Sequence, residues 1–202
     1  TPKLAKLNFD RFQQYDPDFK HNHARQALLA YRGDVYDGIP VSSYTEEDLD
    51  FAQQQVRILS GLYGILKPLD LIQPYRLEMS TKLPNKRGAN LYEYWKEQLT
   101  DYINHEIQEG CHEAVINLAS EEYFKALDKQ ALTKPVIAPA FKDQKNGSYK
   151  TVAIYAKKDR GRMTDFIVRN RITDPDAVQG FDVDGYLYHE ALSSPANPVF
   201  TR

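Results

Sequence analysis

The stretch SGLYGILKPLD, Ser60–Asp70, sets two glycines between apolar segments and decides how the chain around it folds. Thr45 and the three acids that follow it predict a helix start, and apolar residues at helical spacing carry that helix to about Ser60. Gly61 is then the expected helix stop. The residues after Gly64 are again apolar, so the stretch joins a helix to a second apolar segment.

A helix, a glycine turn and a second apolar segment resemble a helix–hairpin–helix motif. In such a motif the backbone N–H groups of the turn bind a nucleic-acid phosphate and a nearby lysine adds charge, which assigns Gly61, Gly64 and Lys67 to phosphate contacts. The two glycines are three residues apart rather than the usual two, and Pro68 shortens any second helix. A helix C-cap followed by a buried turn explains the same residues, and the local pattern does not separate these interpretations.

The composition is that of a globular protein. The 202-residue chain is 42% hydrophobic and 27% charged, and we expect a single domain over residues 1–202. No apolar run approaches the ~20 residues of a membrane-spanning helix. Cys111 is the only cysteine, so no intramolecular disulfide forms and a reducing cytoplasm fits best. The chain begins without Met, so we expect it to be an internal fragment.

The histidines and the cysteine give no metal-binding pattern. The chain has five histidines, and although His21 and His23 have a spacing that metal ligands can have, no acidic partner at ligand spacing is evident. We therefore predict neither a metal nor a cofactor. The sequence gives no oligomeric state.

Charge is distributed unevenly along the chain. The formal net charge is −2, yet residues 145–171 carry a net charge of +6. This asymmetry favours an anion-binding face on an acidic body, whereas a solvated, salt-bridged surface is the simpler alternative. We expect a strand to end at Lys158 and a helix to start at Arg160, so that an anion lies at the helix N-terminus beside Gly161.

The order of the expected elements predicts a mixed α/β (α+β) fold, with a mixed sheet that contains hairpins and is surrounded by helices. The most regular helical pattern covers residues 91–108. A buried strand at 114–120 leads to a helix capped by Ser120, and Asn146-Gly147 predicts a hairpin. The remaining helices and strands are expected at 24–31, 45–60, 69–79, 121–127, 134–144, 149–158, 160–171, 181–191 and 198–202.

A second group of polar residues lies at the predicted ends of strands, where ligand pockets form. Arg76 and Glu78 are two apart on an extended segment and face the same side, next to Tyr75, which can stack on a base. The other candidates for such a pocket are Asn117, Ser120, Tyr155, Lys157 and Arg162. Ordinary helix capping explains Ser120 and part of the role of Asn117.

Three long segments resemble the signature blocks of the YaaA family of peroxide stress proteins. They are QVRILSGLYGILKPLDLIQPYRLEMSTKL at 55–83, VINLASEEYFK at 115–125 and YAKKDRGRMTDFIVRNRI at 155–172. The match runs over the whole chain in order. Family members carry a further N-terminal segment, which we expect this chain to lack.

The resemblance implies a cytoplasmic bacterial protein made under hydrogen peroxide stress. Such a protein limits oxidative damage to DNA and protein, in association with lowered free intracellular iron. The resemblance also implies binding of double-stranded or branched DNA through a positively charged cleft and a helix–hairpin–helix, which here is Ser60–Asp70. The matching cleft residues are Arg76, Lys157, Lys158, Arg160 and Arg162.

Two hypotheses for the function follow. The first is a DNA-binding stress protein that contacts mainly backbone phosphates, and because the family supplies no catalytic residues we assign none. The second is an enzyme acting on a nucleotide or a nucleic-acid base in a pocket near Asn117, Ser120 and Lys157. A desolvated Lys157 would then act as base or nucleophile.

Overall fold

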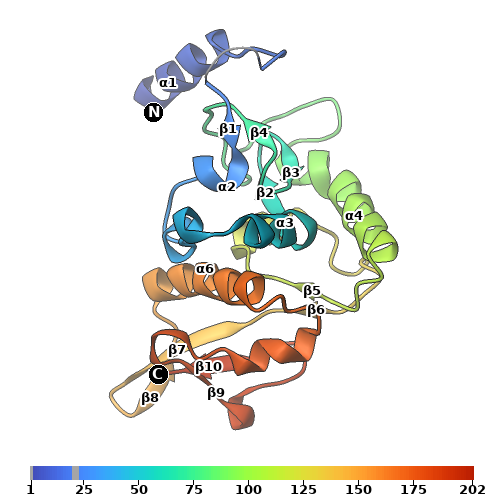
Figure 1. Ribbon diagram of the computed structural model, residues 1–202. Coiled ribbons are helices and arrows are strands. Elements are labelled where there is room, and N and C mark those ends of the chain that lie inside the picture. The colour runs from blue at the N-terminus through green and yellow to red at the C-terminus, as the bar shows by residue number, and fades with distance from the viewer. Residues whose placement is uncertain (1, 20–22) are drawn as a thin grey trace.

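The computed structural model describes residues 2–19 and 23–202 and has the mixed α/β fold that the sequence predicts (Figure 1). The α-helices are α1 (Pro2–Gln13), α2 (Ala27–Ala30), α3 (Glu46–Gln55), α4 (Leu91–Glu109), α5 (Glu121–Phe124) and α6 (Ala153–Arg169). The 3-10 helices are η1 (Tyr36–Gly38), η2 (Val41–Ser43), η3 (Pro175–Gly180), η4 (Val183–Gly185) and η5 (Glu190–Leu192).

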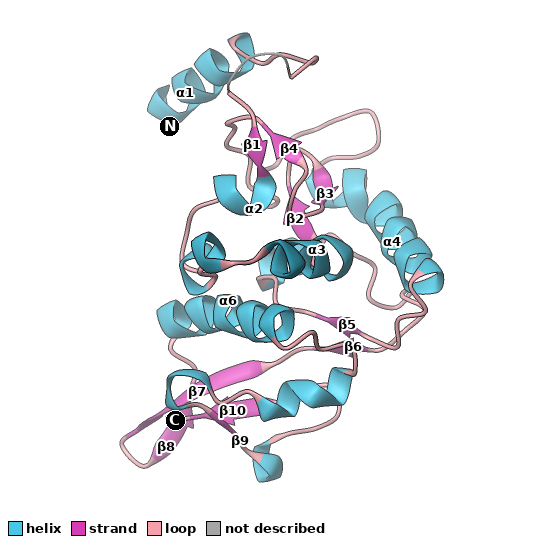
Figure 2. Ribbon diagram, in the orientation of Figure 1, coloured by secondary structure: helices cyan, strands magenta, loops and turns pink. Residues whose placement is uncertain are grey.

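The strands form several small sheets rather than one large sheet (Figure 2). Three are pairs: β1 (Arg25–Gln26) with β4 (Leu71–Ile72), β2 (Ile58–Ser60) with β3 (Gly64–Leu66), and β5 (Val115–Ile116) with β6 (Val136–Ile137). The fourth sheet has the order β8 (Ser148–Lys150), β7 (Ala140–Lys145), β10 (Val199–Thr201), β9 (Leu187–Tyr188). In this sheet β10 is parallel to β7 and antiparallel to β9, so it is a mixed sheet.

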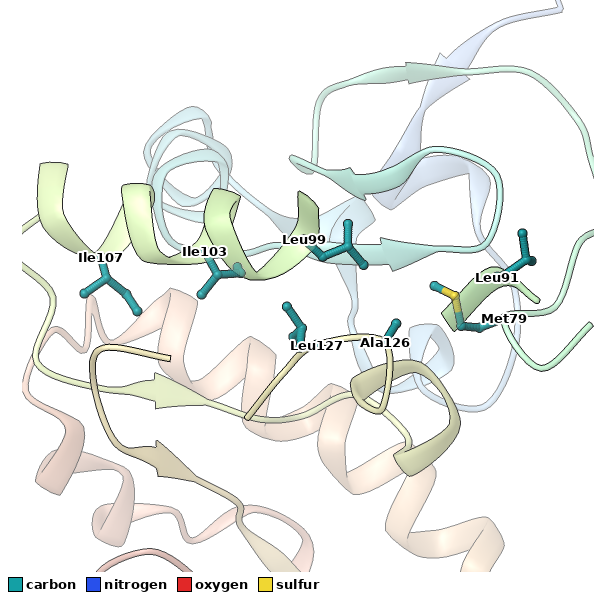
Figure 3. Packing of buried hydrophobic residues seen from close by; sticks show 7 residues of the cluster. All are labelled: Met79, Leu91, Leu99, Ile103, Ile107, Ala126 and Leu127. Atoms are coloured by element: carbon teal, nitrogen blue, oxygen red, sulfur yellow. The ribbon is translucent and has the colours of Figure 1, made fainter. Parts of the chain in front are cut away.

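The apolar core is divided into three clusters, each under a different group of elements. The first lies along α4, where Leu99, Ile103 and Ile107 recur at helical spacing and face Leu127 and Met79 (Figure 3). The second joins α2 to the β2–β3 pair, and the third packs α6, η3 and η4 onto the four-stranded sheet. Helices α3 and α6 contact each other between the upper sheets and the lower sheet (Figure 1).

Several local predictions are confirmed. Thr45 caps α3 in a capping box, because its Oγ1 accepts from the Asp48 N–H while the Asp48 carboxylate accepts from the Thr45 N–H. The 91–108 helix is α4. Ser120 caps α5, and Asn146 and Gly147 have φ of 52° and 74° in the turn between β7 and β8.

The expected helix–hairpin–helix is wrong, because Ser60–Asp70 begins inside a β-hairpin. Helix α3 ends at Gln55, and burial then alternates with period two along β2 and β3. Ser60 is fully buried and its Oγ accepts from the N–H groups of Leu62 and Tyr63, at 3.2 and 3.0 Å. The side chain of Ser60 therefore holds the backbone of the turn that follows it.

The expected strand at 149–158 is also wrong beyond Lys150, because α6 starts at Ala153. Ala156, Asp159 and Met163 are buried on α6 three and four residues apart, a spacing that suits a helix and not a strand. This tertiary packing overrides the strand preference of the β-branched residues before it. Lys157, Lys158, Arg160 and Arg162 thus lie inside the helix, not at its N-terminus.

In the described residues we find no helix whose length and apolar character together would allow it to cross a bilayer.

Candidate functional site

A cavity of about 1230 Å³ lies between the segments that follow β1 and β4, the β5–α5 connection and one face of α6. Its lining includes residues 30–36, 72–78 and 112–124, and α6 contributes Lys157, Thr164 and Ile167. These segments are far apart in sequence, so only the folded chain forms the site. Its volume exceeds the ~300 Å³ that a small-molecule pocket needs.

Four tyrosines give the cavity a largely aromatic wall. Tyr31 and Tyr36 stack with ring centroids 5.2 Å apart, and Tyr31 meets Tyr75 edge-on at 6.3 Å. The Tyr31 and Tyr75 hydroxyl oxygens are 2.6 Å apart, and the Tyr75 hydroxyl is also 2.6 Å from Ser60 Oγ. Tyr123 donates to Glu78 Oε2 at 3.1 Å.

Burial raises the pKa of each of these four phenols, Tyr31, Tyr36, Tyr75 and Tyr123. For Tyr123 the neighbouring Glu78 carboxylate raises the pKa further. The wall therefore stays protonated at neutral pH and keeps its hydroxyl hydrogens as hydrogen-bond donors. A wall of this kind suits a ligand that carries acceptor oxygens.

The polar residues predicted at the end of β5 also lie in this cavity. Asn117 Oδ1 accepts from the Ala119 N–H at 3.0 Å, and Ser120 Oγ accepts from the Tyr123 N–H at 3.4 Å. Within the described chain no hydrogen bond engages the Asn117 amide nitrogen, so two donors there remain for a ligand. Capping explains the position of Ser120, as expected, but for Asn117 the local hydrogen bond accounts only for the amide oxygen.

Charges in the cavity are balanced rather than positive. Arg76 pairs with Glu78 at 3.1 Å and Lys157 pairs with Asp34 at 3.5 Å, and acidic side chains in the lining are as numerous as basic ones. Counted over the described residues, the lining of this cavity is therefore not positively charged. Lys157 is also exposed on α6 and ion-paired, so it is not the desolvated base of the enzyme hypothesis.

The glycines of the opening stretch face the protein interior. A Cβ on Gly61 would meet the Leu77 carbonyl and one on Gly64 would meet the Trp95 ring, whose Nε1 donates to Gly61 O at 3.0 Å. Lys67 lies 3.7 Å from a Glu106 carboxylate oxygen. The N–H groups of Leu62 and Tyr63 in this turn donate to Ser60 Oγ, so these two groups are not available to a phosphate.

The basic residues of α6 point in different directions. Lys158 is exposed, whereas Arg162 is held by Asp159 at 2.6 Å and Asp184 at 2.5 Å. Arg160 is half-buried, burial lowers the pKa of its guanidinium, and it has no ion pair with any described residue. Tyr155 is exposed under the Arg202 guanidinium and lies outside the cavity lining.

Gly161 has a packing role. A Cβ there would collide with the Val35 carbonyl, and one on Gly38 would collide with the Lys158 carbonyl. Helix α6 and η1 therefore cross at a pair of glycines that bring two backbones into contact. No anion is needed to explain Gly161.

A separate basic surface lies where the β7–β8 hairpin leads into α6, and we call it the hairpin–helix surface. Its residues are exposed and alternate cations with large apolar or aromatic side chains: Lys145, Tyr149, Lys150, Ile154, Tyr155 and Lys158. In the part of the chain that the structure describes, no acidic side chain pairs with any of the three lysines. The N-cap of α6 is Val152, whose side chain has no polar atom that could cap the helix.

Sequence reasoning did not find Tyr31 and Tyr36. Tyr31 and Tyr36 lie two and three residues from Gly33. They are 44 and 39 residues from Tyr75 in sequence, and no local pattern connects them with it. The only signal was the composition, since the chain has 14 tyrosines. Among the described residues no cluster of three or more His, Cys, Asp or Glu side chains could hold a metal ion, and His21 lies outside those residues.

The fold and the cavity define a class: a mixed α/β protein with a large tyrosine-lined cavity between two groups of small sheets. The family model described as peroxide stress protein YaaA matches residues 1–192. The chain belongs to this family.

Curated relatives match this chain over its full length. It is 51% identical to a UPF0246 protein of Teredinibacter turnerae over 202 residues, which is all of this chain and 79% of the relative. UPF0246 proteins of Acaryochloris marina and Hahella chejuensis are 52% and 50% identical with the same coverage.

Proposed function

We propose that this protein binds DNA as part of the peroxide stress response, and that it does so through the hairpin–helix surface. Such binding would protect DNA against oxidative damage, with lowered free intracellular iron as an accompanying effect. The proposal keeps the DNA partner, double-stranded or branched, expected from the sequence and moves the contact away from Ser60–Asp70.

The observation that carries the proposal is the group of exposed lysines Lys145, Lys150 and Lys158, which have no acidic partner among the described residues. Contacts from lysine to backbone phosphate release counterions and carry little sequence information. Exposed Tyr149 and Tyr155 between these lysines offer rings that can lie against sugar or an exposed base. The surface therefore suits sequence-independent binding.

The test is fluorescence anisotropy of a labelled random duplex and a branched junction over a range of NaCl concentrations. Changing Lys145, Lys150 and Lys158 together to Gln should lower the slope of log affinity against log salt by about three, because each phosphate contact contributes ~0.9. A triple Gln variant of the exposed Lys82, Lys129 and Lys134 removes the same charge elsewhere and should leave the slope nearly unchanged.

A wild-type protein whose affinity does not depend on salt, or that binds neither DNA at low salt, would contradict DNA binding. Equal slopes for the two triple variants would contradict the assignment of the surface. If Arg76→Gln, in the cavity, lowers the slope while the first triple variant does not, the DNA contact belongs to the cavity instead.

The cavity favours a second candidate function, the binding or conversion of a nucleotide. Asn117, Ser120 and Lys157, which the sequence predicted to share a pocket, all line it, together with aromatic rings and with Arg11, Arg25 and Arg76. Rings and arginines suit a base and a phosphate respectively. Isothermal titration calorimetry with deoxynucleoside monophosphates tests this, and no binding at millimolar concentration would contradict it.

A further inference from the structure

The hydroxyl of Ser60 has only one direction in which it can donate. Ser60 is fully buried, and its Oγ accepts from the N–H groups of Leu62 and Tyr63. A serine hydroxyl has two acceptor positions and one hydrogen. Both acceptor positions are used, and the Tyr75 hydroxyl oxygen at 2.6 Å is the remaining hydroxyl with which Ser60 forms a hydrogen bond among the described residues, so the hydrogen goes there.

The same reasoning fixes the direction at Tyr75. Its hydroxyl receives the Ser60 hydrogen, and its other neighbour is the Tyr31 hydroxyl at 2.6 Å. If Tyr31 donated to Tyr75, the Tyr75 hydrogen would have no acceptor among the described residues, and buried donors without partners are costly. Tyr75 therefore donates to Tyr31, and the hydrogen of Tyr31 is left at the cavity end.

Tyr31 is held in place at both ends. Its ring stacks on Tyr36 with an interplanar angle of 16°, and its oxygen is fixed by Tyr75. Burial raises the pKa of Tyr31, so the phenol remains a donor. Tyr31 and Asn117 both line the cavity, and both offer hydrogens that no described residue accepts.

We propose that Tyr31 is a specificity residue that donates a hydrogen bond to a keto oxygen of a nucleobase in the cavity, with Ser60 and Tyr75 as the residues that set its direction. The inference rests on the second candidate function, that the cavity takes a nucleotide. A hydroxyl with a fixed direction can donate to a keto oxygen, whereas an amino group at the same place offers it no acceptor. The cavity should thus prefer guanine, with its keto oxygen, to adenine, with its amino group.

The experiment compares dGMP with dAMP by calorimetry on the whole chain. Wild-type protein should bind dGMP about tenfold more tightly, the size of one well-placed hydrogen bond. Tyr31→Phe should abolish this preference by weakening dGMP alone, and Tyr75→Phe should reduce it. The ratio of the two affinities is the readout, because a general loss of stability changes both affinities together.

Tyr63→Phe is the control. Tyr63 packs on the Tyr75 ring outside the cavity lining, and its hydroxyl accepts from the Gln73 N–H.

The outcomes separate the two levels of the proposal. Binding of both nucleotides without preference, or a preference that survives in Tyr31→Phe, overturns the role of Tyr31 and leaves the nucleotide cavity in place. Loss of the preference in Tyr63→Phe as well as in Tyr31→Phe overturns the hydroxyl relay. Binding of neither nucleotide overturns the second candidate function and this inference with it.

Discussion

At the scale of the residue, Gly64 shows how one missing side chain positions a hairpin. Its φ is 77°, and a Cβ would lie 2.8 Å from the nearest atom of the Trp95 ring. Gly147 has a similar φ of 74° in the β7–β8 turn, but a Cβ there would have no heavy atom within 4 Å. The two glycines share the same backbone conformation and differ in what surrounds them.

Gly64→Ala should therefore destabilise the protein more than Gly147→Ala. The left-handed backbone costs an alanine about 1 kcal/mol at either position, and overpacking against Trp95 adds about 1–3 kcal/mol at Gly64 alone. Urea unfolding followed by the fluorescence of Trp95, the only tryptophan, measures both free energies. Equal losses would show that the Trp95 contact does not constrain the hairpin.

At the scale of the element, the start of α3 joins a local cap to a distant ion pair. Asp48 is buried, closes the capping box with Thr45 and pairs with Arg171 at 2.7 Å. The Thr45 backbone N–H first, and the Arg171 guanidinium next, hold the pKa of Asp48 below its usual value. The residue thus ties α3 to the chain just after α6.

This lowered pKa makes a prediction about pH. The charged form of Asp48 stabilises the folded state above the unfolded pKa of about 3.9, and this stability is lost as the pH falls through the lower folded value. Asp48→Asn should therefore destabilise the protein at pH 7, and the difference from wild type should shrink toward pH 3. Urea unfolding at several pH values measures it. Asp50→Asn, exposed on the same helix, is the control, and a difference that does not shrink would rule out this role of the carboxylate.

At the scale of the whole molecule, stability is divided among three apolar clusters, and α1 belongs to none of them. No residue of α1 is buried, and Leu7, Phe9 and Phe12 are exposed. A pair of hydrogen bonds between the Asn8 side chain and the Arg76 backbone, at 2.8 and 3.1 Å, attaches the helix next to the cavity. The helix also places Arg11 in the cavity lining.

Backbone amides of α1 should exchange with deuterium much faster than those of α4 and α6, because local opening of α1 exposes little apolar surface. Hydrogen–deuterium exchange with mass spectrometry checks this. Asn8→Ala should speed exchange in α1 further and leave α4 unchanged. Protection of α1 equal to that of α4 would contradict the description of α1 as a weakly attached element.

The sequence by itself determined the features that depend on neighbouring residues. The Thr45 and Ser120 caps, the apolar spacing of α4 and the Asn146-Gly147 turn need only local backbone hydrogen bonds or one helical face, and the family blocks identified the family. Part of the cavity was also predictable, since Asn117, Ser120 and Lys157 were expected to share a pocket.

Only the tertiary structure decided what Ser60–Asp70 and residues 149–158 become. The apolar and glycine patterns there suit a helix or a strand equally, and contacts with Trp95 and with the Val35–Gly38 turn settle them. The tyrosine wall could not be predicted, because Tyr31 and Tyr75 are 44 residues apart and meet through a hydroxyl contact that no local pattern encodes. A cap is a bond to the next turn, whereas this cavity exists only after distant segments have packed.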